Sequence, residues 1–246
     1  MYYSRVDKPW KALVQIRQDD LTALCTAQLH RVLAATDMYA LHQVTTKSGI
    51  DLYFGDHAHG RSVVAELMAS WPCRVKTTRT TVTPELVRQT HLVELCGLKR
   101  HDLVVLRNEV AKKLNLPRVV VVTDVGHGIH LVDPLTGDTG IMTTAMYWRT
   151  PVEPIRSGRE QYIVLDIEPV DVDYSEPGRR DETVVDLEVV RVQDLGCNDT
   201  RFRAQSHLGK DVSVGDKVYG YDLVPMVHAS KRHGMCLLTK DDLPDV

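Results

Sequence analysis

Two histidines of this sequence stand at a spacing that can hold a metal ion. Residues 56–60 read DHAHG, so His57 and His59 are two positions apart. On a strand, such a pair points both imidazoles at one metal, as in some metal-dependent hydrolases, and His127 and His130 are candidates to complete the set. The pair falls between an expected strand and an expected helix, and no acidic residue follows it at ligand spacing. A helix-entry loop, with Asp56 or Ser62 near the cap, is the alternative interpretation.

A second group of residues suits contact with RNA. Tyr147-Trp148-Arg149 places two aromatic rings beside a guanidinium, a combination that can stack on a flat, anionic partner. A packed tyrosine and tryptophan beside a solvated arginine is the alternative. His127 is the tip of a glycine-rich strand connection at 124–128, which could also reach into RNA. That connection lacks the Lys-Ser/Thr pair of a P-loop.

Basic side chains add to this RNA hypothesis. Arg74 and Lys76 are two residues apart and share one face of an expected strand. Arginines interleaved with aromatic residues on a barrel often hold single-stranded RNA or rRNA loops. For any one basic residue taken alone, solvated surface charge is the commoner explanation. With His127, Trp148 and Arg149, the candidate RNA-contact residues are Arg74, Lys76, Lys112, Lys113, Arg118, Arg201 and Arg203. No catalytic triad, nucleophile elbow or dinucleotide fingerprint is present, so we expect no catalytic residue.

The composition is that of a globular protein from a reducing compartment. The chain has 246 residues, 43% hydrophobic and 26% charged, enough for one large domain or two to three small ones. No apolar run is long enough to span a bilayer, and no secretory signal opens the chain. The five cysteines are widely spaced and form no C-x-x-C pair. This argues against a disulfide framework or a zinc ribbon and favours the cytosol or nucleus.

Charge is distributed unevenly along the chain. Residues 1–149 hold 18 Lys and Arg against 14 Asp and Glu, whereas residues 150–246 hold 12 against 19. The mildly basic first part permits contact with RNA but does not demonstrate it.

The first 96 residues predict a β-α-β-β-α-β-β module, in which helices cover a mostly antiparallel sheet. The expected strands cover 11–18, a hairpin at 41–54, 73–82 and 91–95, and the expected helices cover 21–33 and 61–71. From residue 98 the pattern changes to short, closely spaced strands, which predict a small barrel. These strands cover 104–106, 119–123, 129–133 and 141–146, with a helical or turn segment at 110–114.

A second strand series begins at residue 161. Two long strands, 162–174 and 183–195, are joined by a charged turn at 176–182. Acidic residues alternate with Val and Ile here, which predicts a solvated β-ribbon, with an acidic docking edge as the alternative. Further strands are expected at 200–203, 211–214 and 217–221, so residues 161–246 predict a five-stranded barrel of the OB type.

A series of motifs runs in order over nearly the whole chain. They are Trp10 with VQIRQ (14–18), GIDLYF (49–54), PCRVKTT (72–78), IHLVDP (129–134), YWRTP (147–151), HLG (207–209), GDKVYGYDL (215–223) and the closing LPDV. Each motif is weak alone, but IHLVDP followed by YWR and then GYDL is a specific combination. In these residues the chain resembles the large-subunit (60S) ribosomal nuclear export adaptor family, also called the nonsense-mediated decay protein three family.

The resemblance implies an organisation of the chain. It implies an α/β module at 1–96, an SH3-like barrel at 97–150, and an OB-like barrel similar to translation factor five-A at 151–246. In the family, an N-terminal region with C-x-x-C pairs binds zinc, and a tail carries nuclear export and import signals. The present sequence shows neither pattern, so we expect the central part of the family's architecture, with no cofactor in this chain.

The resemblance also implies a function, that of a non-enzymatic ribosome biogenesis factor shuttling between nucleus and cytoplasm. Such an adaptor binds rRNA and ribosomal proteins at the joining face of the pre-60S subunit, near the E site and its mobile stalk. It recruits an exportin through its tail and is released with the help of a cytoplasmic GTPase, with no membrane partner. Two alternatives stay open: a translation factor in the E site of mature ribosomes, and a metal-dependent hydrolase using His57 and His59.

Overall fold

The computed structural model describes residues 10–18, 40–155, 158–169, 184–198, 200–222 and 235–240. The chain divides into two compact units, the first holding residues 1–97, 125–129 and 143–149, and the second holding 98–124, 130–142 and 150–246. Sheet dominates both units and helices are few, so the expected α+β class is confirmed. The module boundaries at residues 96 and 150 stay a prediction. The helix predicted at 21–33 and the turn predicted at 176–182 lie outside the described residues.

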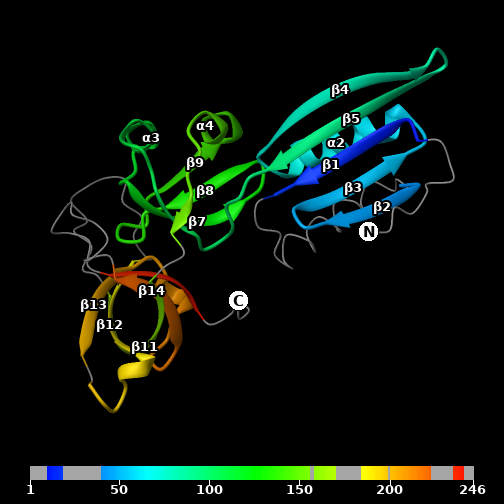
Figure 1. Ribbon diagram of the computed structural model, residues 1–246. Coiled ribbons are helices and arrows are strands. Elements are labelled where there is room, and N and C mark those ends of the chain that lie inside the picture. The colour runs from blue at the N-terminus through cyan, green and yellow to red at the C-terminus, as the bar shows by residue number, and fades with distance from the viewer. Residues whose placement is uncertain are drawn as a thin grey trace. The chain divides into compact units, whose positions relative to one another are not determined.

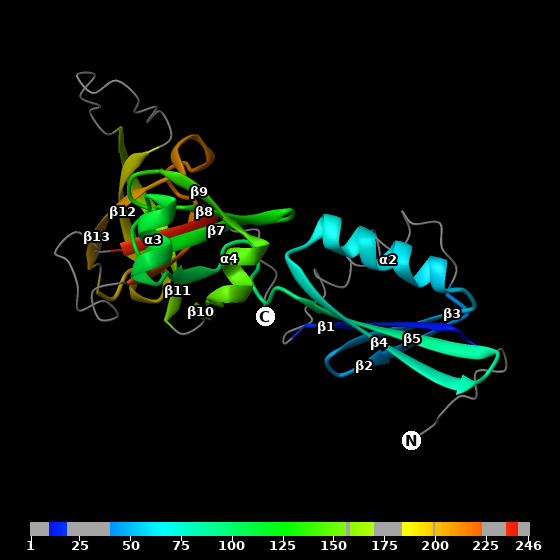
Figure 2. The same cartoon turned by 90° about the horizontal axis from the view of Figure 1, so that it is seen from above.

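The first unit is built on a five-stranded sheet (Figure 1). In spatial order its strands are β2 (His42–Thr46), β3 (Gly49–Phe54), β1 (Ala12–Arg17), β5 (Leu86–Leu95) and β4 (Cys73–Thr83). Only β1 and β5 run parallel, and the other neighbours are antiparallel, as the sequence predicted. Figure 2 shows helix α2 (His57–Ser70) along one face of this sheet.

The core of the first unit lies between that face and α2. Alternate residues of β1, among them Val14 and Ile16, are fully buried and pack with Val63 and Leu67 of the helix. Helix and sheet approach closely at Gly60, where an added Cβ would lie 2.8 Å from the Ala12 Cβ. A larger residue there would force the two layers apart.

Helix α2 begins four residues earlier than predicted. The sequence placed its start at Arg61, because residues 57–60 lack an apolar stripe. In the structure Asp56 caps the helix by accepting a hydrogen bond from the Ala58 N–H at 2.6 Å, so His57 begins the first turn. This hydrogen bond is the largest cause of the lowered pKa of Asp56.

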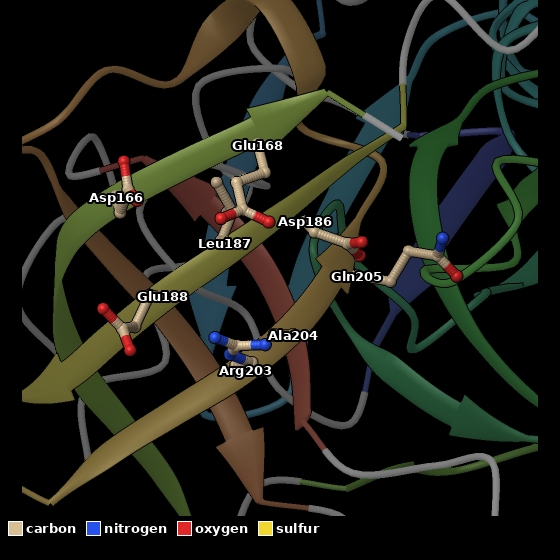
Figure 3. A pocket seen from close by; sticks show the side chains of 8 residues that line it. All are labelled: Asp166, Glu168, Asp186, Leu187, Glu188, Arg203, Ala204 and Gln205. Atoms are coloured by element: carbon tan, nitrogen blue, oxygen red, sulfur yellow. The ribbon is translucent and has the colours of Figure 1, made fainter. Parts of the chain in front are cut away.

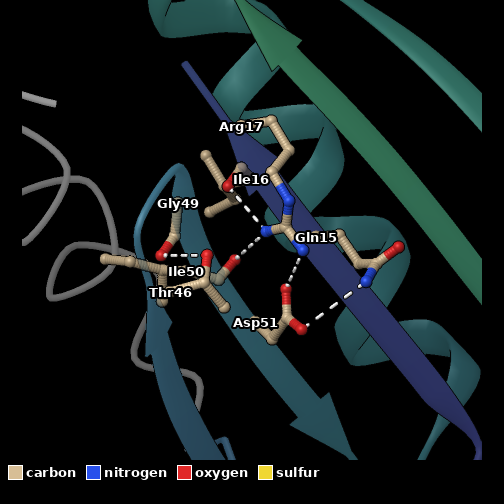
Figure 4. Close-up of polar contacts among 7 residues, drawn as sticks. All are labelled: Gln15, Ile16, Arg17, Thr46, Gly49, Ile50 and Asp51. Carbon is tan, nitrogen blue, oxygen red and sulfur yellow. Dashed lines mark hydrogen bonds and ion pairs between the residues drawn. The ribbon is translucent and has the colours of Figure 1, made fainter. Parts of the chain in front are cut away.

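The opposite face of the sheet carries a polar network between β1 and β3 (Figure 4). Arg17 pairs with Asp51 at 2.6 Å and donates to the carbonyls of Ile16 and Ile50 at 3.0 and 3.4 Å. At Gly49, opposite Arg17, any Cβ would collide with the Ile16 carbonyl oxygen, so this close strand approach requires glycine.

The second unit holds two small β-structures, the first of which has the strand order of an SH3-like barrel. Strands β6 to β9 follow one another, and the last strand returns beside β6. In spatial order they are β10 (Pro154–Ile155), β6 (Leu103–Val105), β7 (Val119–Val125), β8 (Gly128–Val132) and β9 (Thr139–Thr143). The predicted strand 141–146 is wrong beyond Thr143, because helix α4 (Thr144–Arg149) begins there.

Within the described residues, no helix has both the length and the apolar character needed to cross a bilayer.

The second β-structure is an OB-like barrel. In spatial order its strands are β13 (Arg201–Ser206), β12 (Val185–Arg191), β11 (Arg159–Pro169), β14 (Lys217–Asp222) and β15 (Met235–Lys240). Contacts between β13 and β15 close the sheet on itself. The strand predicted at 211–214 is wrong, since a 3-10 turn (Gly209–Asp211) leads there into an irregular connection. Strand β15 was not predicted from the sequence.

Tyr221 of β14 joins the two β-structures of the second unit. Its ring packs with Leu103, Val121 and Val132 in the core of the SH3-like barrel. Its hydroxyl donates to the Ile155 carbonyl at 2.6 Å. The OB-like barrel thus contributes a side chain to its neighbour's core, and this shared packing accounts for their joining in one compact unit.

His207 adds a polar contact to the same joint. Its ring hydrogen-bonds the backbone of Pro134, which has only a carbonyl to offer, and Asp133 and Asp211 lie near enough to act on it electrostatically. Burial nevertheless dominates and lowers the pKa of His207, because desolvation disfavours the charged imidazolium. His207 belongs to the HLG motif and Pro134 to the IHLVDP motif, so two separate motifs meet at this joint.

The Tyr221 joint is open to a direct test. We expect Tyr221→Phe to lower the free energy of unfolding of the second unit by about 1 kcal/mol, because the partly buried Ile155 carbonyl loses its donor. Urea unfolding measures this change. Tyr219→Phe is the matched control, because the Tyr219 ring stacks with Arg159 at 5.3 Å and the substitution keeps that ring. Equal stabilities of the two variants would contradict the shared joint.

The lowered pKa of His207 makes stability depend on pH. The folded state holds this proton less tightly than the unfolded chain, so the free energy of unfolding should fall as pH drops below about 6.5. We expect His207→Gln to flatten this decline in a series of melts between pH 5 and pH 7.5. His59→Gln, at an exposed position, is the control. If stability falls with pH as steeply in His207→Gln as in the unaltered protein, His207 is not the cause of the decline.

Candidate RNA-binding surface

Four cations gather around helix α3 (Asn108–Leu114), which connects β6 to β7. Arg107 precedes the helix, Lys112 and Lys113 lie in its last turn, and Arg118 leads into β7. All four side chains are exposed. We call these four residues the α3 cluster.

Backbone geometry holds the α3 cluster in place. The Leu106 N–H donates to the Arg118 carbonyl at 2.6 Å, and Arg118 Nε donates back to the Leu106 carbonyl at 3.2 Å. These bonds join the two chain segments that flank the helix. Asn115, left-handed at φ 54°, ends the helix. Two lysines therefore lie at the helix C-terminus, where the helix dipole favours positive charge.

The α3 cluster is free to meet an anionic partner. Within the described residues, Lys112 and Lys113 form no ion pair, and Glu109 is the only acidic residue of α3. Arg107 is not among the candidate contacts predicted from the sequence, although its place directly before a lysine-bearing helical segment is a usable signal. Exposed cations on rigid elements are the usual means of contacting phosphates.

Arg74 and Trp148 are engaged with each other. The Arg74 guanidinium forms two hydrogen bonds with Glu94, at 2.6 and 2.9 Å, and lies 4.6 Å from the centre of the Trp148 ring. The hydrogen bond from Arg74 lowers the pKa of Glu94, and the same bond raises the pKa of Arg74. Tyr147 is buried, and its hydroxyl accepts from the Gly97 N–H at 3.3 Å. These contacts correspond to the alternative interpretation of Tyr147-Trp148-Arg149, in which a packed tyrosine and tryptophan lie beside an exposed arginine.

His127 and the paired histidines lie apart in the fold. His127 is exposed at the turn between β7 and β8, where the Gly126 N–H donates to the Gly128 carbonyl at 3.0 Å. His57 and His59 lie on α2, where side chains two residues apart point to nearly opposite sides. The strand geometry behind the metal hypothesis is therefore wrong for this pair. Over the described part of the chain, no group of three or more metal-binding side chains occurs.

Arg203 lies on an acidic face of the OB-like barrel (Figure 3). Arg201, two residues before it on β13, shares this face. This face holds two like-charged pairs directly opposite each other on neighbouring strands, Asp166 with Glu188 and Glu168 with Asp186. Arg201 pairs with Glu188 at 3.0 Å, and Arg203 lies opposite Glu188 across the strands. The four carboxylates of this face outnumber its two arginines, so the face repels phosphate, whereas the α3 cluster attracts it.

The architecture and its exposed charge define a class of protein. The chain is a modular α+β protein with an SH3-like and an OB-like barrel, and a group of exposed cations lies on the first barrel. Two family models match it: "NMD3, second domain" over residues 9–95 and "NMD3 OB-fold domain" over residues 160–246. The chain belongs to the NMD3 family.

Individual relatives agree with this assignment. The fission yeast (Schizosaccharomyces pombe) protein is 30% identical over 96% of this chain and 48% of its own length. The Saccharomyces cerevisiae protein is 28% identical over 86% of this chain and 42% of its own, and the human protein 24% identical over 96% and 50%. All three are named 60S ribosomal export protein. The chain spans about half the length of the curated relatives it matches.

The different surroundings of Trp148 and Arg149 predict different effects of substitution. We expect Trp148→Ala to lower the free energy of unfolding of the first unit by about 2 kcal/mol, less than for a fully buried tryptophan. Arg149→Ala, the matched control in the same helix, should leave it unchanged because that side chain is exposed. Urea unfolding followed by circular dichroism measures both. A Trp148→Ala protein as stable as the control would show that the contact with Arg74 is not structural.

Proposed function

We propose that this chain is the ribosome-binding body of a 60S export adaptor, which binds the pre-60S subunit for nuclear export and late cytoplasmic maturation. The α3 cluster carries the proposal, because it presents unpaired cations from a helix fixed at both ends. The name shared by the relatives, 60S ribosomal export protein, supports the 60S subunit as the particle that is bound.

The binding mode follows from this geometry. Phosphate contacts position a protein on RNA without reading its sequence, and each one releases counterions. The Tyr221 contact holds the two barrels of the second unit together, so the α3 cluster and the OB-like barrel meet the particle as one body. Recognition of this kind depends on the shape of the RNA and is sensitive to salt. No catalytic step is part of this function.

The resemblance extends the proposal to particular partners. We place the bound surface at the joining face and E-site region, with rRNA and ribosomal proteins near the mobile stalk. In this scheme a signal-bearing tail recruits the exportin, C-x-x-C pairs bind zinc, and a cytoplasmic GTPase assists release, while the protein shuttles between nucleus and cytoplasm. Residues 1–246 contain no C-x-x-C pair, so the zinc belongs to another part of the family pattern.

Charge reversal in the α3 cluster tests the proposal. We expect Lys112→Glu with Lys113→Glu to weaken binding to purified pre-60S particles roughly tenfold or more at moderate salt, and to make the salt dependence shallower. The matched control is Lys47→Glu with Lys217→Glu, which changes the same charge at exposed positions elsewhere. Filter binding over a salt series, with a thermal melt of each variant, measures the effect. Equal affinity of the two double variants would remove the α3 cluster from the interface.

A further inference from the structure

The hairpin formed by β4 and β5 extends beyond the rest of the sheet of the first unit (Figure 1). Strand β1 pairs with β5 only from Gln89 onward, so the segment 80–88 has no third strand beside it. All eight residues of 76–83 are exposed. Successive side chains of a strand point to opposite faces, so both faces of this part of β4 are uncovered. We call residues 76–88 the hairpin arm.

The side chains of the hairpin arm suit a polyanion. Its charged residues are Lys76, Arg79 and Arg88, against a single acidic residue, Glu85, at the turn. Of its five exposed threonines, Thr77 is hydrogen-bonded to His91, and the other four add hydroxyl groups, namely Thr78, Thr80, Thr81 and Thr83. Arginine, lysine and threonine are among the residues that most often contact phosphates in nucleic-acid complexes, together with backbone N–H groups. As an outer strand of the sheet, β4 also offers such N–H groups along its free edge.

The base of the hairpin arm is firmly held. Thr77 Oγ1 hydrogen-bonds His91 Nδ1 at 2.9 Å, and the Gln89 N–H donates to the Lys11 carbonyl at 2.8 Å. The Arg88 guanidinium lies 4.2 Å from the centre of the Trp10 ring. These contacts fix the arm in its extended position before any partner binds, which reduces the entropic cost of binding.

The charges favour RNA over a protein strand as the partner. Lysine and arginine on an edge strand hinder pairing with another strand, a common means of preventing edge-to-edge association. The exposed apolar side chains of the arm are few: Val82 at 47% and Val87 at 38%, both near the turn. Two small apolar residues at the end of a cationic ribbon suit contact with sugars and base edges more than a protein interface, whose core is large and apolar.

We propose that the hairpin arm is a second RNA-binding element, which lies against the sugar-phosphate backbone of the large-subunit rRNA. The inference rests on the proposed function, since it names a further surface for the same particle. Lys76 and Arg79 neutralise phosphates, the threonine hydroxyls donate to phosphate oxygens, and the turn enters a groove or junction of the RNA.

Binding of the intact chain to purified, protein-free large-subunit rRNA tests this inference. We expect Lys76→Glu with Arg79→Glu to weaken binding about tenfold and to reduce the slope of affinity against salt by roughly one to two. Glu85→Lys should strengthen binding by several-fold. The control for the first variant is Lys47→Glu with Lys217→Glu, and for the second Glu66→Lys at an exposed position of α2. Thermal melts establish that all variants fold.

The possible outcomes separate this inference from the proposed function. If the α3-cluster variant loses affinity while both arm variants match their controls, the arm inference is overturned and the proposed function stands. If the arm variants bind naked rRNA normally but bind pre-60S particles weakly, the partner is a ribosomal protein, and the RNA assignment is overturned. If the unaltered chain binds neither rRNA nor particles, both proposals fail.

Discussion

The second unit depends on one aromatic side chain that serves two barrels. Tyr221 belongs to a strand of the OB-like barrel, yet its ring packs into an apolar cluster of the SH3-like barrel, and its hydroxyl donates to the Ile155 carbonyl. That cluster holds Leu103, Val119, Val121 and Val132, so the two small barrels bury apolar surface against each other, which small domains need for stability. The shared packing turns two small modules into one body, on which the α3 cluster has a fixed place relative to the OB-like barrel.

The availability of each cation depends on strand register more than on residue type. Arg74 lies directly opposite Glu94 and is held by it, and Arg201 is held by Glu188 on the neighbouring strand. Lys112 and Lys113 have no carboxylate opposite them, because they lie on a short helix whose only acidic residue is in its first turn. Lys76 and Arg79 of the hairpin arm are likewise not held by its one acidic residue, Glu85, because that residue lies at the turn. Among the described residues, the α3 cluster and the hairpin arm are therefore places where cations lie without a carboxylate directly across a strand.

Much of the fold could be predicted from the sequence, because alternation and turn residues are local signals. The hairpin at 41–54, the strands at 11–18 and 73–82, and the long strands of the OB-like barrel were all recognisable. The start of α2 was missed because residues 57–60 lack an apolar stripe, and only the hydrogen bond that Asp56 accepts from the Ala58 N–H reveals it. The start of helix α4 was read as strand because Ile141 to Met146 is a mostly apolar run that continues β9. Among the candidate contacts, residue type led to Lys112 and Lys113, whose side chains are exposed in the structure, and their contact with RNA stays a prediction. The pairing of Arg74 with a residue 20 positions away could be found only from the register of the sheet.

The central claim is that this body binds the immature large subunit. Sedimentation of the tagged chain on a gradient of cell extract, with identification of the co-migrating RNA, tests it most directly. The account predicts co-migration with particles that contain precursor large-subunit rRNA, weakened as salt is raised. Association confined to mature ribosomes would contradict it and favour a translation factor, and protein that stays at the top of the gradient would contradict ribosome binding altogether.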